Sequence, residues 1–111
     1  MGVKFMLENL GSIMEMVKKI QQNIENVQEN LKNERIEVSS GDVIKVVING
    51  QQDIISIELN AKYLAPDNAA LLQDLLVATI NNALTKSRDL NQTAMNKLTS
   101  ELNLPKIPGL F

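Results

Sequence analysis

The fold of this chain is decided by residues 43–59, which read VIKVVINGQQDIISIEL. Two runs rich in β-branched residues flank the Asn49-Gly50 step, the strongest short-range signal for a β-hairpin. Both residues of such a step tolerate the positive φ that tight hairpin turns require. We therefore expect a hairpin turn at Asn49-Gly50 and expect Gly50 to be needed there for its backbone conformation.

A third strand precedes the hairpin. Residues 35–39 alternate apolar and charged side chains, and Ser40-Gly41-Asp42 has turn chemistry. The sequence thus predicts a three-stranded antiparallel sheet over about residues 35–59. One face should carry Ile44, Val46 and Ile48 with Ile55, Ile57 and Leu59 beside them. The other face should combine the polar Lys45, Ser56 and Glu58 with the apolar Val43, Val47 and Ile54.

A long amphipathic helix is predicted before the sheet, from about residue 4 to about residue 33. Its apolar residues recur at alternating steps of three and four, which is typical of a heptad seam between helices. An ordinary amphipathic core helix is the alternative interpretation. The seam positions are Val3, Met6, Leu10, Ile13, Val17, Ile20, Ile24, Val27 and Leu31.

A second long helix is predicted over about residues 68–103, with Asp67 as its N-cap. The small residues Ala83, Ser87 and Ala94 would let another helix approach it closely. Two prolines then favour an extended tail over residues 104–111. The predicted fold is α+β: one domain over residues 1–111, with the order helix, three-stranded antiparallel sheet, helix (α-β-β-β-α). We expect a homodimer, because two long seams and a half-apolar outer sheet face are more than one small core can use.

The composition argues against enzyme chemistry. The chain has 44% hydrophobic and 22% charged residues, and it contains no Cys, His or Trp. Histidine is the commonest general base, and thiolate and imidazole are the usual ligands of zinc. We therefore expect no catalytic residues, no metal and no cofactor. No stretch approaches the ~18 apolar residues of a membrane span, so we expect no membrane partner and a cytoplasmic location.

Charge is distributed unevenly along the chain, although the net charge is only -2. Residues 1–20 and 86–111 hold seven basic and four acidic residues, whereas residues 21–85 hold four basic and nine acidic ones. In the predicted fold the first two segments lie away from the sheet, at the far ends of the helices. A molecule polarised in this way can bind a phosphate backbone at one end despite an acidic total. Ordinary solubilising charges are the alternative interpretation.

The chain resembles the YbaB/EbfC family of bacterial nucleoid-associated DNA-binding proteins. The resemblance covers nearly the full length and includes a Met/Gln/Glu-rich first helix. Its motifs are VVING at residues 46–50, ISIEL at 55–59, Tyr63-Leu64, LLVATINNA at 75–83, Leu104-Pro105 and PGLF at 108–111. It implies an intertwined or tweezer-like homodimer, with helical arms that project from a central sheet. Such a dimer binds duplex DNA in the nucleoid and takes part in nucleoid organisation and gene regulation.

Placement of the charges suggests which residues would contact DNA. We expect basic side chains near the arm ends to contact phosphates, which positions a protein without reading bases. These residues are Lys18, Lys19, Lys86, Arg88 and Lys97. The alternative is a protein-interaction or scaffolding module without direct DNA binding. Its helical arms would engage another protein, and recognition would rest on Val43, Val47, Ile54 or residues 104–111.

Overall fold

The structure, a computed structural model, describes the backbone of residues 2–101 and the side chains of residues 10–101. The predicted tail at 104–111 lies outside the described residues. The elements are, in order, α1 (Gly2–Asn33), β1 (Ile36–Ser40), β2 (Ile44–Ile48), β3 (Ile54–Leu59), the 3-10 turns η1 (Ala61–Tyr63) and η2 (Pro66–Asn68), and α2 (Ala69–Glu101). The predicted α-β-β-β-α order is confirmed.

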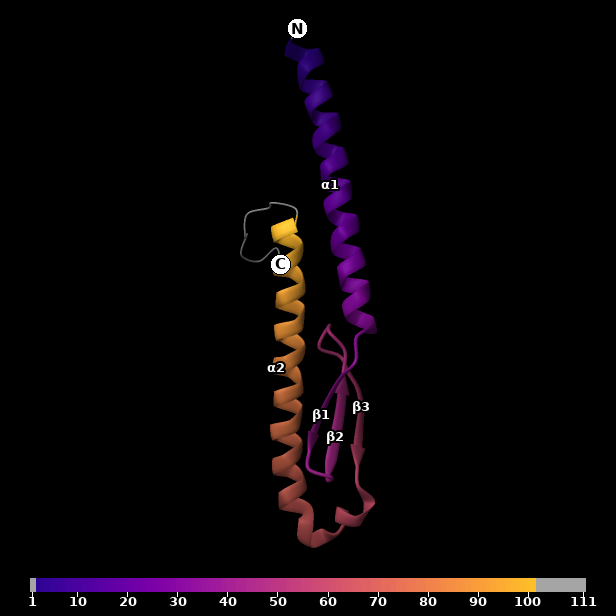
Figure 1. Ribbon diagram of the computed structural model, residues 1–111, viewed down its shortest axis with the longest axis vertical. Coiled ribbons are helices and arrows are strands. Elements are labelled where there is room, and N and C mark those ends of the chain that lie inside the picture. Colours follow the sequence, from indigo (N-terminus) through magenta and orange to yellow (C-terminus); the bar gives the residue numbers. More distant parts are fainter. Residues whose placement is uncertain (1, 102–111) are drawn as a thin grey trace.

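The molecule is long and narrow, with principal extents of 81 × 21 × 19 Å. The first half of α2 lies along the sheet, and its second half runs beside the end of α1 that precedes the sheet (Figure 1). The rest of α1 continues past the end of α2 (Figure 1). We call this projecting part, residues 2–20, the arm.

The core lies between α2 and the first two strands of an antiparallel sheet with the order β1-β2-β3. β-Branched residues on alternate positions of β1 and β2 face the helix. Ala83 of α2 is fully buried against them, and buried Thr79 is hydrogen-bonded to Ser40 with 2.6 Å between the two hydroxyl oxygens. The buried cluster consists of Val38, Ile44, Val46, Ile48 and Ala83.

Strand β3 forms an edge whose inner face α2 leaves open. Ile57 lies opposite Val46 and Leu59 lies opposite Ile44, as predicted. A β-bulge then shifts the register, so that Ile54 rather than Ile55 lies opposite Ile48, and the prediction for these two residues is wrong. The side chains of this face remain partly in solvent: Ile54, Ile57 and Leu59 are 41%, 42% and 38% exposed.

The loop between β2 and β3 differs from the predicted two-residue turn. β2 ends at Ile48 and β3 begins at Ile54, which leaves the five-residue loop 49–53. Among its residues the positive φ belongs to Gln52, at 66°, and not to Gly50. The Asn49 side-chain oxygen accepts hydrogen bonds from the backbone N–H of Gln51 (2.9 Å) and of Asp53 (3.0 Å). Asn49 therefore organises a wider loop through its side chain, as Asn does in Asx-turns.

Gly50 is needed for a different reason from the one predicted. Its backbone N–H donates to the carbonyl oxygen of Leu31 in the last turns of α1, at 2.8 Å. A Cβ at position 50 would lie 2.8 Å from that same oxygen and 2.8 Å from Leu31 Cδ2. The absence of a side chain therefore permits the close approach of the loop to α1.

The same loop is also held by α2. The Ser87 hydroxyl donates to the carbonyl oxygen of Asn49 at 2.7 Å and accepts from the Gln52 N–H at 2.9 Å. Ala83 and Ser87 thus face the sheet and this loop, so the prediction that they admit another helix is wrong. Ala94 does line a groove between α2 and α1.

The entry into α2 also differs from the prediction. Asp67 is not an N-cap, because it lies inside η2, which runs directly into the helix. The residue before η2 is Ala65, which makes no capping side-chain bond. Pro66 instead supplies a fixed φ at the first position, a favoured way to begin helical backbone.

Among the seam residues whose side chains the structure describes, those that pack against α2 lie in the second half of α1. Leu31 is buried, and Val27 lines the groove that also contains Leu90, Ala94 and Leu98 of α2. Leu10, Ile13 and Val17 on the arm, by contrast, are exposed, and Ile20 at its end is half-buried. The predicted contact between helices is therefore present where α1 and α2 overlap.

We expect Gly50→Val to lower the free energy of unfolding by at least about 1–3 kcal/mol, because the new side chain must push the loop away from Leu31. Gly11→Ala is the control: a Cβ added there would have no atom within 4 Å, and alanine is worth about 0.5–1 kcal/mol more than glycine in a helix. Urea unfolding at one fixed protein concentration measures both. Equal stability of Gly50→Val and the parent would show that the loop does not depend on this contact.

Candidate nucleic-acid interface

Lys18 and Lys19 lie on the arm, beyond the end of α2. The two helices run antiparallel, and the Gln28 amide nitrogen lies 3.4 Å from the Met95 sulfur. Counting the same number of residues along each helix from this contact places Glu101 at the level of Gln22. Both lysines are exposed, and their arm has no other described element beside it (Figure 1).

The three basic residues predicted on α2 lie at other levels of the molecule. Lys86 and Arg88 flank Ser87, so they sit beside the loop 49–53 and not at an arm end. Lys97 lies eleven residues, about 16 Å, further along the helix and lines the interhelical groove together with Glu34 and Glu101. The structure therefore spreads the five predicted residues along its long axis and does not gather them into one compact cluster.

The residue spacing along α2 also determines to which side of the helix each basic residue points. Eleven residues make about three helical turns, so Lys86 and Lys97 point to the same side of α2. Arg88 lies about 200° around the helix from Lys86 and faces the opposite way. Lys86 and Lys97 therefore share one side of α2, and Arg88 lies on the other.

The basic residues of the sheet end are compensated by acids. Lys45 on the outer face of β2 lies 3.8 Å from Glu37 and 3.7 Å from Glu58. Lys62 lies 3.1 Å from Asp42. Among residues 10–101, these are the basic residues that form ion pairs, and none of the five predicted DNA-binding residues is among them.

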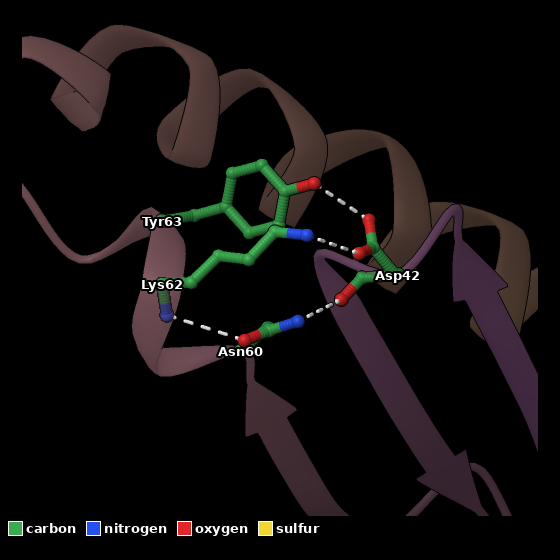
Figure 2. Close-up of polar contacts among 4 residues, drawn as sticks. All are labelled: Asp42, Asn60, Lys62 and Tyr63. Atoms are coloured by element: carbon green, nitrogen blue, oxygen red, sulfur yellow. Dashed lines mark hydrogen bonds and ion pairs between the residues drawn. The ribbon is translucent and has the colours of Figure 1, made fainter.

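Asp42 is the centre of a polar cluster at the sheet end, shown in Figure 2. Its carboxylate accepts hydrogen bonds from the Tyr63 hydroxyl at 2.7 Å and the Lys62 ammonium at 3.1 Å. Its backbone carbonyl accepts one from the Asn60 side-chain amide at 3.0 Å. The Lys62 nitrogen also lies 5.1 Å from the centre of the Tyr63 ring. The cluster fastens the β1–β2 turn to η1.

These contacts shift two protonation equilibria. The hydrogen bond from Tyr63, followed by that from Lys62, holds the pKa of Asp42 below its ordinary value of 3.8. The hydrogen bond to Asp42 raises the pKa of Lys62 above its ordinary value of 10.5. The sequence predicts only a turn at Asp42. Its hydrogen-bond partners lie about twenty residues later, and nothing in the local sequence indicates them.

Other kinds of site find little support in the part of the chain that the structure describes. Its His, Cys, Asp and Glu residues form no group of three that could hold a metal ion. A hollow of about 270 Å³ beside Asp42 is open to solvent and lined by both strand and turn residues. Neither described helix has the length and apolar character needed to cross a membrane.

Comparisons with known proteins agree on one family. The model of the YbaB/EbfC DNA-binding family matches residues 6–102. A nucleoid-associated protein of Desulforamulus reducens is 45% identical over 104 residues, covering 93% of this chain and 96% of the relative. Proteins with the same description from Pelotomaculum thermopropionicum (40% identity, 93% and 96% covered) and Syntrophobacter fumaroxidans (38%, 88% and 92%) are also similar.

Removal of the Tyr63 hydroxyl should raise the pKa of Asp42 toward 3.8, because the largest stabiliser of its charged form is lost. Carboxyl-carbon NMR titration of Tyr63→Phe measures this shift. Since a depressed pKa stabilises the fold only while the carboxylate is charged, the stability difference from the parent should be present at neutral pH. It should vanish as acid titrates Asp42.

Lys62→Met is the companion variant for this test. It should also raise the pKa of Asp42, because it removes both the hydrogen bond and the coulombic attraction of Lys62. An unchanged pKa in Lys62→Met would show that the ion pair does not act on this carboxylate.

Proposed function

The chain belongs to the YbaB/EbfC DNA-binding family, a family of nucleoid-associated proteins and not of enzymes, and from this premise we propose that it acts as a homodimer on duplex DNA. In this proposal its basic residues contact phosphates, and the protein works in the nucleoid in DNA organisation and gene regulation. The proposal of phosphate contacts rests on one observation. The lysines of the sheet end form ion pairs with acids, whereas Lys18 and Lys19 of the arm form none among residues 10–101.

That difference matters because a lysine that already forms an ion pair with an acid gains little binding free energy from contact with a phosphate. Lys45 lies between two glutamates, and Lys62 is bound to Asp42. Lys18 and Lys19 are adjacent and exposed, and no ion pair involves them among residues 10–101. Binding of such free cations to DNA releases counterions, which supplies most of the sequence-independent affinity.

The proposed homodimer rests on the open face of β3. This strand is a sheet edge, and one side of its backbone has no partner strand among residues 2–101. Ile57 and Leu59 point to the same face as the buried core yet remain about two-fifths exposed. An apolar edge of this kind is a liability unless another surface covers it, and a second copy offers the matching apolar face.

We expect the double variant Lys18→Ala with Lys19→Ala to bind all duplexes more weakly and to flatten the salt dependence of binding. Each lost phosphate contact should reduce the slope of log K against log salt by about 0.9. The matched control is Lys45→Ala with Lys62→Ala, whose lysines are paired with acids. Mobility-shift titrations over a salt series measure both variants, after circular dichroism has confirmed their folding.

Two results would contradict the DNA proposal. An equal loss of affinity in the control pair would show that the sheet, and not the arm, contacts DNA. If binding showed no salt dependence and neither double variant changed the affinity, the alternative of a protein-interaction module would be favoured instead.

The dimer is tested separately. We expect Ile57→Lys to weaken dimerisation at least tenfold in sedimentation equilibrium, since an unpaired charge would be buried in the apolar interface. Ser56→Lys, on the same strand but the opposite face, is the control and should leave the dimer intact. A folded parent chain that sediments as a monomer at micromolar concentration would refute the dimer.

A further inference from the structure

The arm carries an apolar face that is wider than the rest of the α1 seam. Leu10, Ile13 and Val17 continue the heptad seam, and Met14 and Met16 flank it on either side. These five side chains are between 46% and 64% exposed, and no described element lies beside them (Figure 1). A contiguous apolar face of this kind indicates a contact surface and is not ordinary helix surface.

The residues that flank the seam change character near the level where α2 ends. Beside α2 they are polar, namely Asn23, Gln28 and Asn30, and one helix covers the narrow seam between them. On the arm they are methionines, whose flexible side chains adapt to an apolar partner. The arm is therefore patterned for an apolar contact that is broader than the contact with α2.

The charges of α1 indicate which partner fits this face. The charged residues between positions 10 and 30 lie at least about 130° around the helix from the middle of the seam. The flanking residues are uncharged throughout, so the face offers no attraction to a charged partner. A second arm has the same apolar and uncharged face, and two copies can meet there without burying or opposing charges. The uncharged flanking residues are Met14, Met16, Gln21, Asn23, Gln28 and Asn30.

We propose that the arms of two copies pair antiparallel along this seam. From the level of Gln22 toward the sheet, α2 already lies on the seam side of α1. A second α1 in the parallel direction would have to pass through the position of α2, whereas an antiparallel arm ends before it. The seam left open by α2 covers residues 2–21, about 30 Å, and the arm itself is about 28 Å long. The two lengths match.

One register fits both the heptad pattern and these lengths. With a two-fold axis between residues 11 and 12, Leu10 of one arm lies beside Ile13 of the other, and each arm ends where the other copy's α2 ends. The surface of β3 lies at the sheet end, and Lys18 and Lys19 point away from the seam. The arm contact thus goes beyond the proposed DNA binding and does not depend on the contact through β3. A chain with both contacts assembles beyond a dimer.

Sedimentation equilibrium of the full chain tests the contact. We expect Ile57→Lys, which removes the proposed contact through β3, to leave a reversible association that Ile13→Asp weakens at least tenfold, since a charge would be buried in the seam. Ser12→Asp is the control: it adds the same charge on the polar side of the arm and should change nothing. Circular dichroism checks that each variant folds.

The outcomes separate the two contacts. An Ile57→Lys chain that is monomeric at millimolar concentration would overturn the arm contact. If the contact through β3 were wrong instead, Ile57→Lys would leave the association of the parent chain unchanged, while Ile13→Asp would still weaken it. A monomeric Ile57→Lys chain that binds anionic lipid vesicles, with loss of binding in Ile13→Asp, would make a lipid surface the occupant and would likewise overturn the proposal.

Disulfide trapping tests the direction of the arms. Because the sequence has no cysteine, Leu10→Cys and Ile13→Cys each provide a single thiol. In an equimolar mixture under a glutathione redox buffer, we expect the mixed disulfide between the two variants to exceed either symmetric disulfide. Ser12→Cys, on the polar side, should form few disulfides. Predominance of the symmetric disulfides would indicate parallel arms, and trapping no greater than in Ser12→Cys would indicate no contact; either result would overturn the proposal.

Discussion

The architecture depends on the contact between Gly50 and Leu31. The hydrogen bond from the Gly50 N–H goes to the Leu31 carbonyl oxygen in the last turn of α1, which also accepts from the Glu34 N–H at 3.2 Å. Gln51 reaches the Gln28 carbonyl oxygen, about one turn earlier in α1, through its side-chain amide at 3.0 Å. Ser87 and Asn91 of α2 hold the other side of the loop, Asn91 by a 3.0 Å bond to the Gly50 carbonyl oxygen. One loop thus joins both helices to the sheet.

That junction also separates the two electrostatic regions of the molecule. On the sheet side, lysines are paired with carboxylates, which leaves little field to attract an anion. On the far side, α1 continues alone and carries Lys18 and Lys19 into solvent. Lys18 and Lys19 therefore lie beyond the packed part of the molecule. Lys86, Arg88 and Lys97, which the charge distribution of the sequence grouped with them, lie within it.

Periodic patterns predicted the fold well, because they reflect burial along each element. The two long helices, the three strands and the inner face of β2 follow directly from them. Features that depend on distant residues were not predictable: Asn49-Gly50 looks like a tight turn, but contacts with Leu31 and Ser87 select a wider loop. For the same reason, the levels of Lys86 and Lys97 relative to the arm could not be derived, since the offset between α1 and α2 is set at this loop.

The length of α1 beyond its anchor gives the loop a mechanical consequence. From Leu31 to Gly2 the helix extends about 44 Å, so a rotation of about 5° at the anchored end displaces the far end by about 4 Å. That displacement is comparable to the rise of one DNA base pair. Helix α1 pivots at its contact with Gly50. The rigidity of that contact therefore determines how far the N-terminal end of the helix moves.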